Sequence, residues 1–219
     1  MIKAILFDCD GVLMDTERMA NEINAELLQQ AGIPMTYEDC RLHLTGRTEA
    51  GVKAWLEANF EGKVGDWDAA SLVWNQRFRQ RVKDTKPVMP GAEMMLASLT
   101  LPFAVVTNAG WDDMNFKFEA TGLDRFFASD LRFSGQALNM PKPHPGAYLA
   151  AASKLAIAPE HCVVIEDSII GATAGLNAGM QVWGFTADAK ESDLVGVGVH
   201  RCFERLDQLS DMVVKANIQ

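Results

Sequence analysis

The sequence predicts an α/β protein with a Rossmann-like parallel sheet, helices on both faces, and an all-helical domain inserted after the first strand. A short apolar run that starts at Ala4 ends in acidic residues, and a long stretch of helical periodicity follows it. Beyond residue 87, apolar runs of strand length alternate with helical segments. This alternation is typical of βαβ units, whose right-handed crossovers place helices on both faces of a parallel sheet.

The first predicted strand is the apolar run that ends in Asp8 and Asp10, with Gly11 directly after them. Such a run is typical of a buried parallel strand, because both of its faces are covered. Acidic residues at its C-terminal end are expected in the crevice where open α/β sheets bind ligands. Two carboxylates this close repel each other, and a bound cation is the simplest compensation.

Residues 16–85 contain no strand-like run and are predicted to form the helical insertion. Apolar residues recur at helical spacing over 17–31 and again in two later segments. Thr36, followed three residues later by Asp39, resembles a capping box that opens a short helix. The sequence therefore predicts two domains. Residues 1–15 and 86–219 form the α/β domain, and residues 16–85 form the helical domain.

The alternation of helices and strands resumes after the Pro- and Gly-rich segment 87–91. The predicted helices are 92–99, 112–121, 146–156 and 169–178. The predicted strands are 103–106, 130–133, 162–165 and 180–185.

Composition excludes several classes of function. The chain has 219 residues, of which 48% are hydrophobic, and a net charge of -9 with a pI of about 4.9. It has no run rich in Lys or Arg, which argues against binding to nucleic acid or to an anionic membrane surface. No apolar stretch approaches the roughly 18 residues that a membrane span requires. A small anionic substrate, which needs only a few donors, stays compatible with this composition.

The four cysteines, Cys9, Cys40, Cys162 and Cys202, are scattered without a C-x-x-C pair. This spacing does not favour a zinc site. We expect Cys9 and Cys162 to be small buried side chains. The absence of a recognisable signal peptide, together with free cysteines, predicts a soluble protein of the reducing cytoplasm.

Polar groups follow three later segments, each at a predicted strand end or in a loop. Because the C-terminal ends of parallel strands meet at one edge of the sheet, these groups are expected to converge with Asp8 and Asp10. They are Thr107 and Asn108, Lys142 between two prolines, and Glu166 with Asp167.

This set of groups favours phosphoryl transfer. Carboxylates at Asp8 and Asp167 suit Mg²⁺, and Thr107 with Lys142 suits the oxygens of a phosphoryl group. One carboxylate can attack phosphorus to form an aspartyl-phosphate. The second, two residues on, can protonate the leaving oxygen and later deprotonate water. The cation screens the repulsion between an anionic nucleophile and an anionic substrate.

The motifs D-C-D-G, V-V-T-N, P-K-P and I-E-D-S, in this order, resemble the haloacid dehalogenase (HAD) superfamily over essentially the whole chain. The helical insertion looks like the branch that contains β-phosphoglucomutase and small sugar-phosphate phosphatases. The resemblance implies that Asp8 is the nucleophile and a metal ligand. It also implies that Asp10 is the general acid and base, and that Asp10 ligates the metal through its backbone carbonyl.

The same resemblance implies roles for the later motifs. Thr107, Asn108 and Lys142 would hold the transferring phosphoryl group. Asp167 would ligate Mg²⁺, with Glu166 in the inner or outer shell of the metal. In this branch a turn between cap helices often recognises the non-phosphate part of the substrate. The corresponding turn in this sequence is Gly46-Arg47. Arg47 then either binds an anionic or hydroxylated leaving group or is an exposed surface arginine, and both interpretations stay open.

Departures from the branch favour a phosphatase. A β-phosphoglucomutase-like enzyme typically carries a histidine in the first cap helix, and residues 17–21 contain none. Its cap-loop arginine is also displaced here, so water is the expected phosphoryl acceptor. Asp10 disfavours dehalogenation, and Lys53 is the only lysine over 16–60 that could form the imine of a phosphonate hydrolase.

We therefore expect a Mg²⁺-dependent phosphatase that hydrolyses a small phosphorylated metabolite, such as a sugar phosphate or sugar-acid phosphate, and works as a monomer. The first alternative is a β-phosphoglucomutase-like phosphomutase. The second is a non-catalytic binding or sensor protein on the same fold, against which the intact Asp8, Asp10, Lys142 and Asp167 argue.

Overall fold

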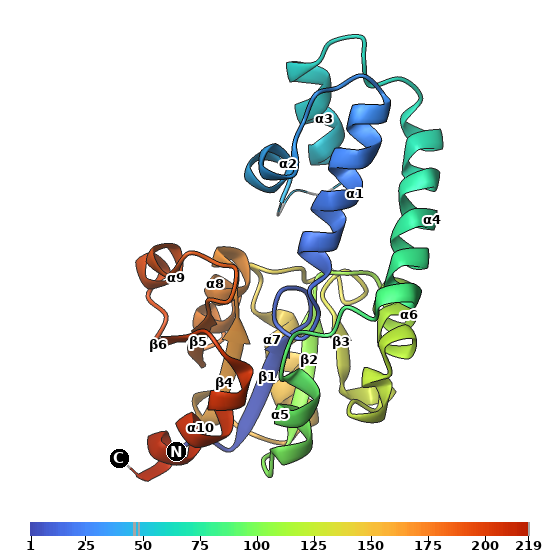
Figure 1. The fold of residues 1–219 in the computed structure, drawn as a ribbon. Helices are drawn as coiled ribbons and strands as arrows, with labels where there is room; N and C mark the ends of the chain where they lie inside the picture. The colour runs from blue at the N-terminus through green and yellow to red at the C-terminus, as the bar shows by residue number, and fades with distance from the viewer. Residues whose placement is uncertain (46, 48, 219) are drawn as a thin grey trace. The chain divides into compact units, whose positions relative to one another are not determined.

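A computed structural model, which describes all residues except 46, 48 and 219, shows an α/β protein built on a six-stranded sheet (Figure 1). The strands are β1 (Ala4–Asp8), β2 (Phe103–Thr107), β3 (Arg132–Ser134), β4 (Cys162–Glu166), β5 (Gln181–Phe185) and β6 (Arg201–Phe203). Their order is β3-β2-β1-β4-β5-β6, and every neighbouring pair is parallel. The predicted fold class is confirmed.

Helices cover both faces of this sheet (Figure 1). They are α5 (Ala92–Ser98), α6 (Trp111–Thr121), α7 (Gly146–Lys154), α8 (Ile169–Asn177), α9 (Glu191–Val197) and α10 (Leu209–Ile218). In β1, Ile5 and Phe7 pack with α5, α6 and α10, whereas Ala4 and Leu6 pack with α7, α8 and α9. Successive side chains of a strand point to opposite faces, so a run of apolar residues supplies both cores.

The central position of β1 places its acidic end next to two other strand ends. β1 lies between β2 and β4, with Asp8 level with Val106 and Phe7 level with Ile165. Thr107 and Glu166, the last residues of β2 and β4, therefore end on either side of Asp8. This is the point of the sheet where the strand order reverses, and open α/β sheets bind ligands there.

The chain divides into two compact units, Met1–Met14 together with the chain from Pro87 onward, and Asp15–Lys86. The second unit contains α1 (Thr16–Gln30), α2 (Tyr37–His43), α3 (Glu49–Asn59) and α4 (Trp67–Thr85). Its own core consists of the buried side chains Ala25, Ile33, Met35, Cys40, Leu44 and Leu56. The capping box at Thr36 and Asp39 is present and begins α2.

The structure also bears on the cysteines, on the C-terminal part of the chain and on membrane-spanning helices. Cys9 and Cys162 are buried and free, as predicted. The chain after residue 185, where the sequence indicated no element, forms α9, β6 and α10. Within the described residues, no helix is both long and apolar enough to cross a membrane.

Candidate active site

A buried lysine joins the ends of β1 and β4. Lys142 Nζ donates to Glu166 Oε1 at 2.6 Å and also contacts Asp8 Oδ1. The Lys142 side chain is 4% exposed, and the Glu166 side chain is fully buried. An ammonium this deeply buried needs opposite charges at contact distance, and these two carboxylates provide them.

Glu166 accepts hydrogen bonds at both oxygens, in addition to its contact with Lys142. Its Oε1 accepts from the Tyr148 hydroxyl at 2.9 Å. Its Oε2 accepts from the main-chain nitrogens of Asp167 and Ser168 at 3.2 and 3.1 Å, and from Ser168 Oγ at 2.9 Å. A carboxylate held by five donors is well suited to fix Lys142 in place. The Ser168 side chain also caps α8 by accepting from Gly171 N.

Two glycines leave the space that the carboxylates occupy. A Cβ on Gly171 would lie 1.7 Å from Glu166 Oε1, and a Cβ on Gly11 would lie 1.9 Å from Asp167 Oδ2. Gly11 also has a φ of +88°, a backbone conformation that is strained for a residue with a Cβ. Both positions therefore require glycine for the acidic cluster to form.

The acidic cluster fits a divalent cation. Asp8, Glu166 and Asp167 each offer a carboxylate oxygen, and these three atoms lie within 4.8 Å of one another. Carboxylate oxygens at the mouth of a sheet are ligands for hard cations such as Mg²⁺. Because Glu166 already accepts from Lys142, Tyr148 and its own neighbouring main chain, Asp8 and Asp167 are better placed to ligate directly.

Burial and charge shift the protonation of this cluster. Burial raises the pKa of Asp8 to about 8, and the Lys142 ammonium only partly opposes this shift. Burial alone would lower the pKa of Lys142, but Asp8 and Glu166 outweigh it and hold that pKa well above its ordinary value. Lys142 therefore stays charged at neutral pH, and a cation bound beside Asp8 would favour the Asp8 carboxylate.

The end of β2 supplies a hydroxyl and an amide. Thr107 is buried, its Oγ1 accepts from Ala109 N at 3.0 Å, and it donates to Asp10 Oδ2 at 3.4 Å. The Asn108 side chain accepts from Lys142 N at 2.7 Å and donates to Lys142 O at 3.2 Å. The Asn108 side chain thus holds the main chain of Lys142, and the role in phosphoryl binding that the resemblance implies for Asn108 stays a prediction.

Sequence reasoning missed Lys117, which pairs with Asp10. Lys117 Nζ lies 2.5 Å from Asp10 Oδ1 and 2.7 Å from Asp10 Oδ2, and its side chain is 5% exposed. Burial would lower the pKa of Lys117, but Asp10 reverses the effect and raises it above the ordinary value. The signal in the sequence is a lysine on the apolar stripe of a helix, because the buried residues of α6 include Met114, Lys117 and Phe118. Tyr148 was likewise missed.

Of the predicted site residues, most converge in the α/β unit. Asp8, Lys142, Glu166 and Asp167 form one cluster, and Asp10 contacts Thr107. Gly46 lies outside the described residues, and its predicted role stays a prediction.

Arg47 belongs to the helical unit, where it is exposed and its Nε donates to the main-chain oxygen of His43 at 2.5 Å. It lines a cavity of about 350 Å³ within that unit.

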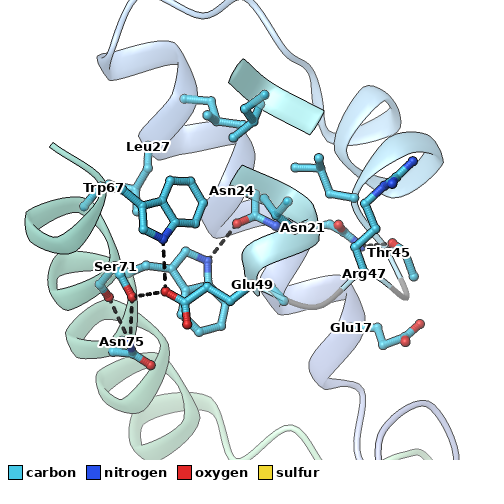
Figure 2. A pocket seen from close by; sticks show the side chains of 17 residues that line it. Glu17, Asn21, Asn24, Leu27, Thr45, Arg47, Glu49, Trp67, Ser71 and Asn75 are labelled. Atoms are coloured by element: carbon cyan, nitrogen blue, oxygen red, sulfur yellow. Dashed lines mark hydrogen bonds between the residues drawn. The ribbon is translucent and has the colours of Figure 1, made fainter. Parts of the chain in front are cut away.

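Two indole rings line the same cavity, and Figure 2 shows the N–H group of Trp67 directed at Glu49. Trp67 Nε1 donates to Glu49 Oε1 at 3.2 Å, and Trp74 Nε1 donates to Asn24 Oδ1 at 2.8 Å. A mostly apolar cavity with a few oriented polar groups is typical of a small-molecule site.

Comparisons with known proteins agree with one another. The model of the haloacid dehalogenase-like hydrolase family matches residues 2–179. A 6-phosphogluconate phosphatase from Escherichia coli (strain K12) is 27% identical over 215 residues, covering 96% of this chain and 94% of the relative. Hexitol phosphatase A from the same organism is 26% identical, covering 88% of this chain and 89% of the relative.

A solved structure has the same fold along nearly the whole chain. It is a HAD family hydrolase from Deinococcus radiodurans R1, solved with bound phosphate and sodium. It is 28% identical with a TM-score of 0.87, and the match covers 99% of this chain and 96% of that one.

Proposed function

The chain belongs to the haloacid dehalogenase-like hydrolase family and is a phosphoric monoester hydrolase, and we propose that it hydrolyses a small phosphorylated metabolite through an aspartyl-phosphate on Asp8. One observation carries this proposal. The Asp8 carboxylate lies at the C-terminal end of the central strand, against the buried Lys142 ammonium and within a cluster of three carboxylates. This arrangement offers a nucleophile, a cation for the phosphoryl oxygens and ligands for a metal.

In the first step, an Asp8 carboxylate oxygen attacks phosphorus while the bond from phosphorus to the leaving oxygen breaks. The leaving oxygen takes its proton from Asp10 in its carboxylic-acid form, and the carboxylate that results is the form with which Lys117 pairs. In the second step, Asp10 takes a proton from water as the water oxygen attacks phosphorus. The bond from phosphorus to Asp8 then breaks, which releases inorganic phosphate and restores Asp8.

The remaining residues hold the phosphoryl group. Lys142 is proposed to bind one phosphoryl oxygen through an N–H that its two carboxylate partners leave available. Thr107 is proposed to bind another phosphoryl oxygen through its hydroxyl and the adjacent main-chain amides. Asp8, Asp167 and the main-chain carbonyl of Asp10 are proposed to hold Mg²⁺. When bound, this ion would supply positive charge that screens the repulsion between the Asp8 carboxylate and the phosphate. Glu166 is proposed not to contact the phosphoryl group itself but to position Lys142.

The proposed substrate class is a phosphorylated sugar, sugar acid or sugar alcohol, because the relatives are phosphatases of 6-phosphogluconate and of hexitols. The helical unit is proposed to serve as a cap domain that recognises the part of the substrate beyond the phosphate. Its cavity, lined by Trp67, Trp74, Asn24 and Arg47, supports this proposal, because aromatic faces with amide groups suit a hydroxylated carbon chain.

Release of inorganic phosphate from a panel of sugar, sugar-acid and hexitol phosphates, with and without Mg²⁺, tests the proposal. We expect turnover with Mg²⁺ and none after chelation, while the circular dichroism of the protein stays unchanged. Isomerisation of a hexose 1-phosphate without free phosphate would instead establish a phosphomutase. Failure to turn over any phosphomonoester would favour the non-catalytic alternative.

A further inference from the structure

Helix α6 carries a lysine where its packing calls for an apolar side chain. Met114, Lys117, Phe118 and Thr121 are the buried residues of this helix, spaced three or four apart as on one helical face. Lys117 is 4% exposed, so bulk water does not solvate its ammonium group. A buried charge is costly unless an opposite charge and hydrogen bonds compensate it, and Asp10 provides both.

The contacts restrict the orientation of the Asp10 carboxylate. Lys117 Nζ contacts Oδ1 at 2.5 Å and Oδ2 at 2.7 Å, and Thr107 Oγ1 reaches Oδ2 at 3.4 Å. The terminal torsion of an aspartate is otherwise broad, so these contacts select one orientation. The Asp10 side chain is still 27% exposed, which leaves part of it accessible to a reacting oxygen.

The two buried lysines of the site serve different carboxylates. Lys142 contacts Asp8 and Glu166, on the side of the nucleophile. Lys117 contacts Asp10, the side chain to which the proposed function assigns proton transfer. Proton transfer requires donor and acceptor within hydrogen-bond distance, so a loosely held carboxylate transfers protons poorly.

We propose that Lys117 is a positioning residue that holds the Asp10 carboxyl group in the orientation from which it gives its proton to the leaving oxygen, and that pairs with the carboxylate so formed. This inference rests on the proposed function. It predicts a defect that depends on the leaving group. An alkoxide must receive a proton as the bond from phosphorus to oxygen breaks, whereas 4-nitrophenolate leaves without one.

The test compares kcat/KM for an alkyl phosphate and for 4-nitrophenyl phosphate in the wild type and in Lys117→Met. This parameter reports the transfer to Asp8 and is independent of the later attack by water. We expect the variant to lose about 10- to 100-fold on the alkyl phosphate, within the range of general acid catalysis, and less than about threefold on the aryl phosphate. Lys117→Arg keeps the charge and the donors and is expected to keep the wild-type ratio of the two values.

Lys154→Met is the matched control, because Lys154 forms an exposed ion pair with Asp130 at 2.7 Å in the same unit. It should change neither value. If Lys117→Met does not fold, Lys117→Gln takes its place and is expected to lower the ratio, in contrast to Lys117→Arg. An equal loss on both substrates, or no loss, overturns the inference. A wild-type protein that releases phosphate from neither ester contradicts the proposed function instead.

Discussion

Gly171→Ala adds one methyl group to helix α8 and tests how Glu166 is held. The added Cβ would lie 1.7, 2.0 and 2.4 Å from Oε1, Cδ and Oε2 of Glu166, so the carboxylate cannot stay where it is. Displacing it breaks its contacts with Lys142 and Tyr148 and with the start of α8. Loss of one partner from a buried ion pair costs about 3–5 kcal/mol.

The helical propensity of alanine offsets part of this loss. Replacing glycine by alanine within a helix stabilises it by about 1 kcal/mol. The net destabilisation is therefore about 2–4 kcal/mol. For a chain of this size each kcal/mol lowers the Tm by about 2–4 °C, so the expected fall in Tm is about 4–16 °C.

Differential scanning calorimetry and phosphate release measure the two consequences. We expect the lower Tm together with a loss of turnover, because Lys142 loses the carboxylate that positions it. Gly196→Ala in α9 is the matched control, since a Cβ at that position meets no atom within 4 Å. It should leave the Tm unchanged or raise it slightly. A Gly171→Ala protein with unchanged Tm and full activity would refute the placement of Glu166.

Two further perturbations probe the charges. Asp10→Asn leaves the Lys117 ammonium buried without its counter-charge and is expected to destabilise the protein by about 3 kcal/mol. The double variant Asp10→Asn/Lys117→Met should recover most of that loss of stability in thermal melts. A double variant less stable than Asp10→Asn would contradict the pairing. The Asp8 pKa of about 8 predicts that Mg²⁺ binding releases a proton below that pH. The Mg²⁺ affinity measured by calorimetry should then fall by up to about tenfold per unit as pH decreases below 8, and a flat profile from pH 6 to 8 would disagree.

The positions of the polar groups at the strand ends were predictable because the apolar strands end abruptly in this sequence. β1, β2 and β4 are short apolar runs that end in Asp8, Thr107 and Glu166. A parallel sheet brings such ends to one edge, so order along the chain was enough to predict their convergence. Lys142 lies in a loop, and only its place between two prolines and the family resemblance pointed to it.

The charge pairing within the site was not predictable from the same patterns. Lys117 lies on α6, ten residues after Thr107 but 107 residues after its partner Asp10, and its role depends on the rotation of α6 against the sheet. Tyr148 in α7 reaches Glu166 for the same reason. Such contacts follow from tertiary packing, which periodicity does not encode beyond the choice of a buried face.

The last part of the fold was also missed, and for β6 the reason is physical. β6 has only three residues, Arg201–Phe203, and its burial rises from exposed to buried along that length. As an edge strand it borders one neighbour, β5, and needs no continuous apolar run. α9 has only seven residues and one buried side chain, Leu194. α10 does place Leu209, Met212, Val213 and Ala216 at helical spacing, a pattern that the prediction did not use.

Trapping the phosphorylated enzyme tests the central claim most directly. The protein is mixed with Mg²⁺ and a substrate from the phosphate-release panel, quenched in acid during the first turnovers, and analysed by intact-mass and peptide-mass spectrometry. We predict one phosphoryl adduct, located on the peptide that contains Asp8 and absent from Asp8→Asn. Rapid turnover with no adduct at any time, or an equal adduct in Asp8→Asn, would contradict the assignment of Asp8 as the nucleophile.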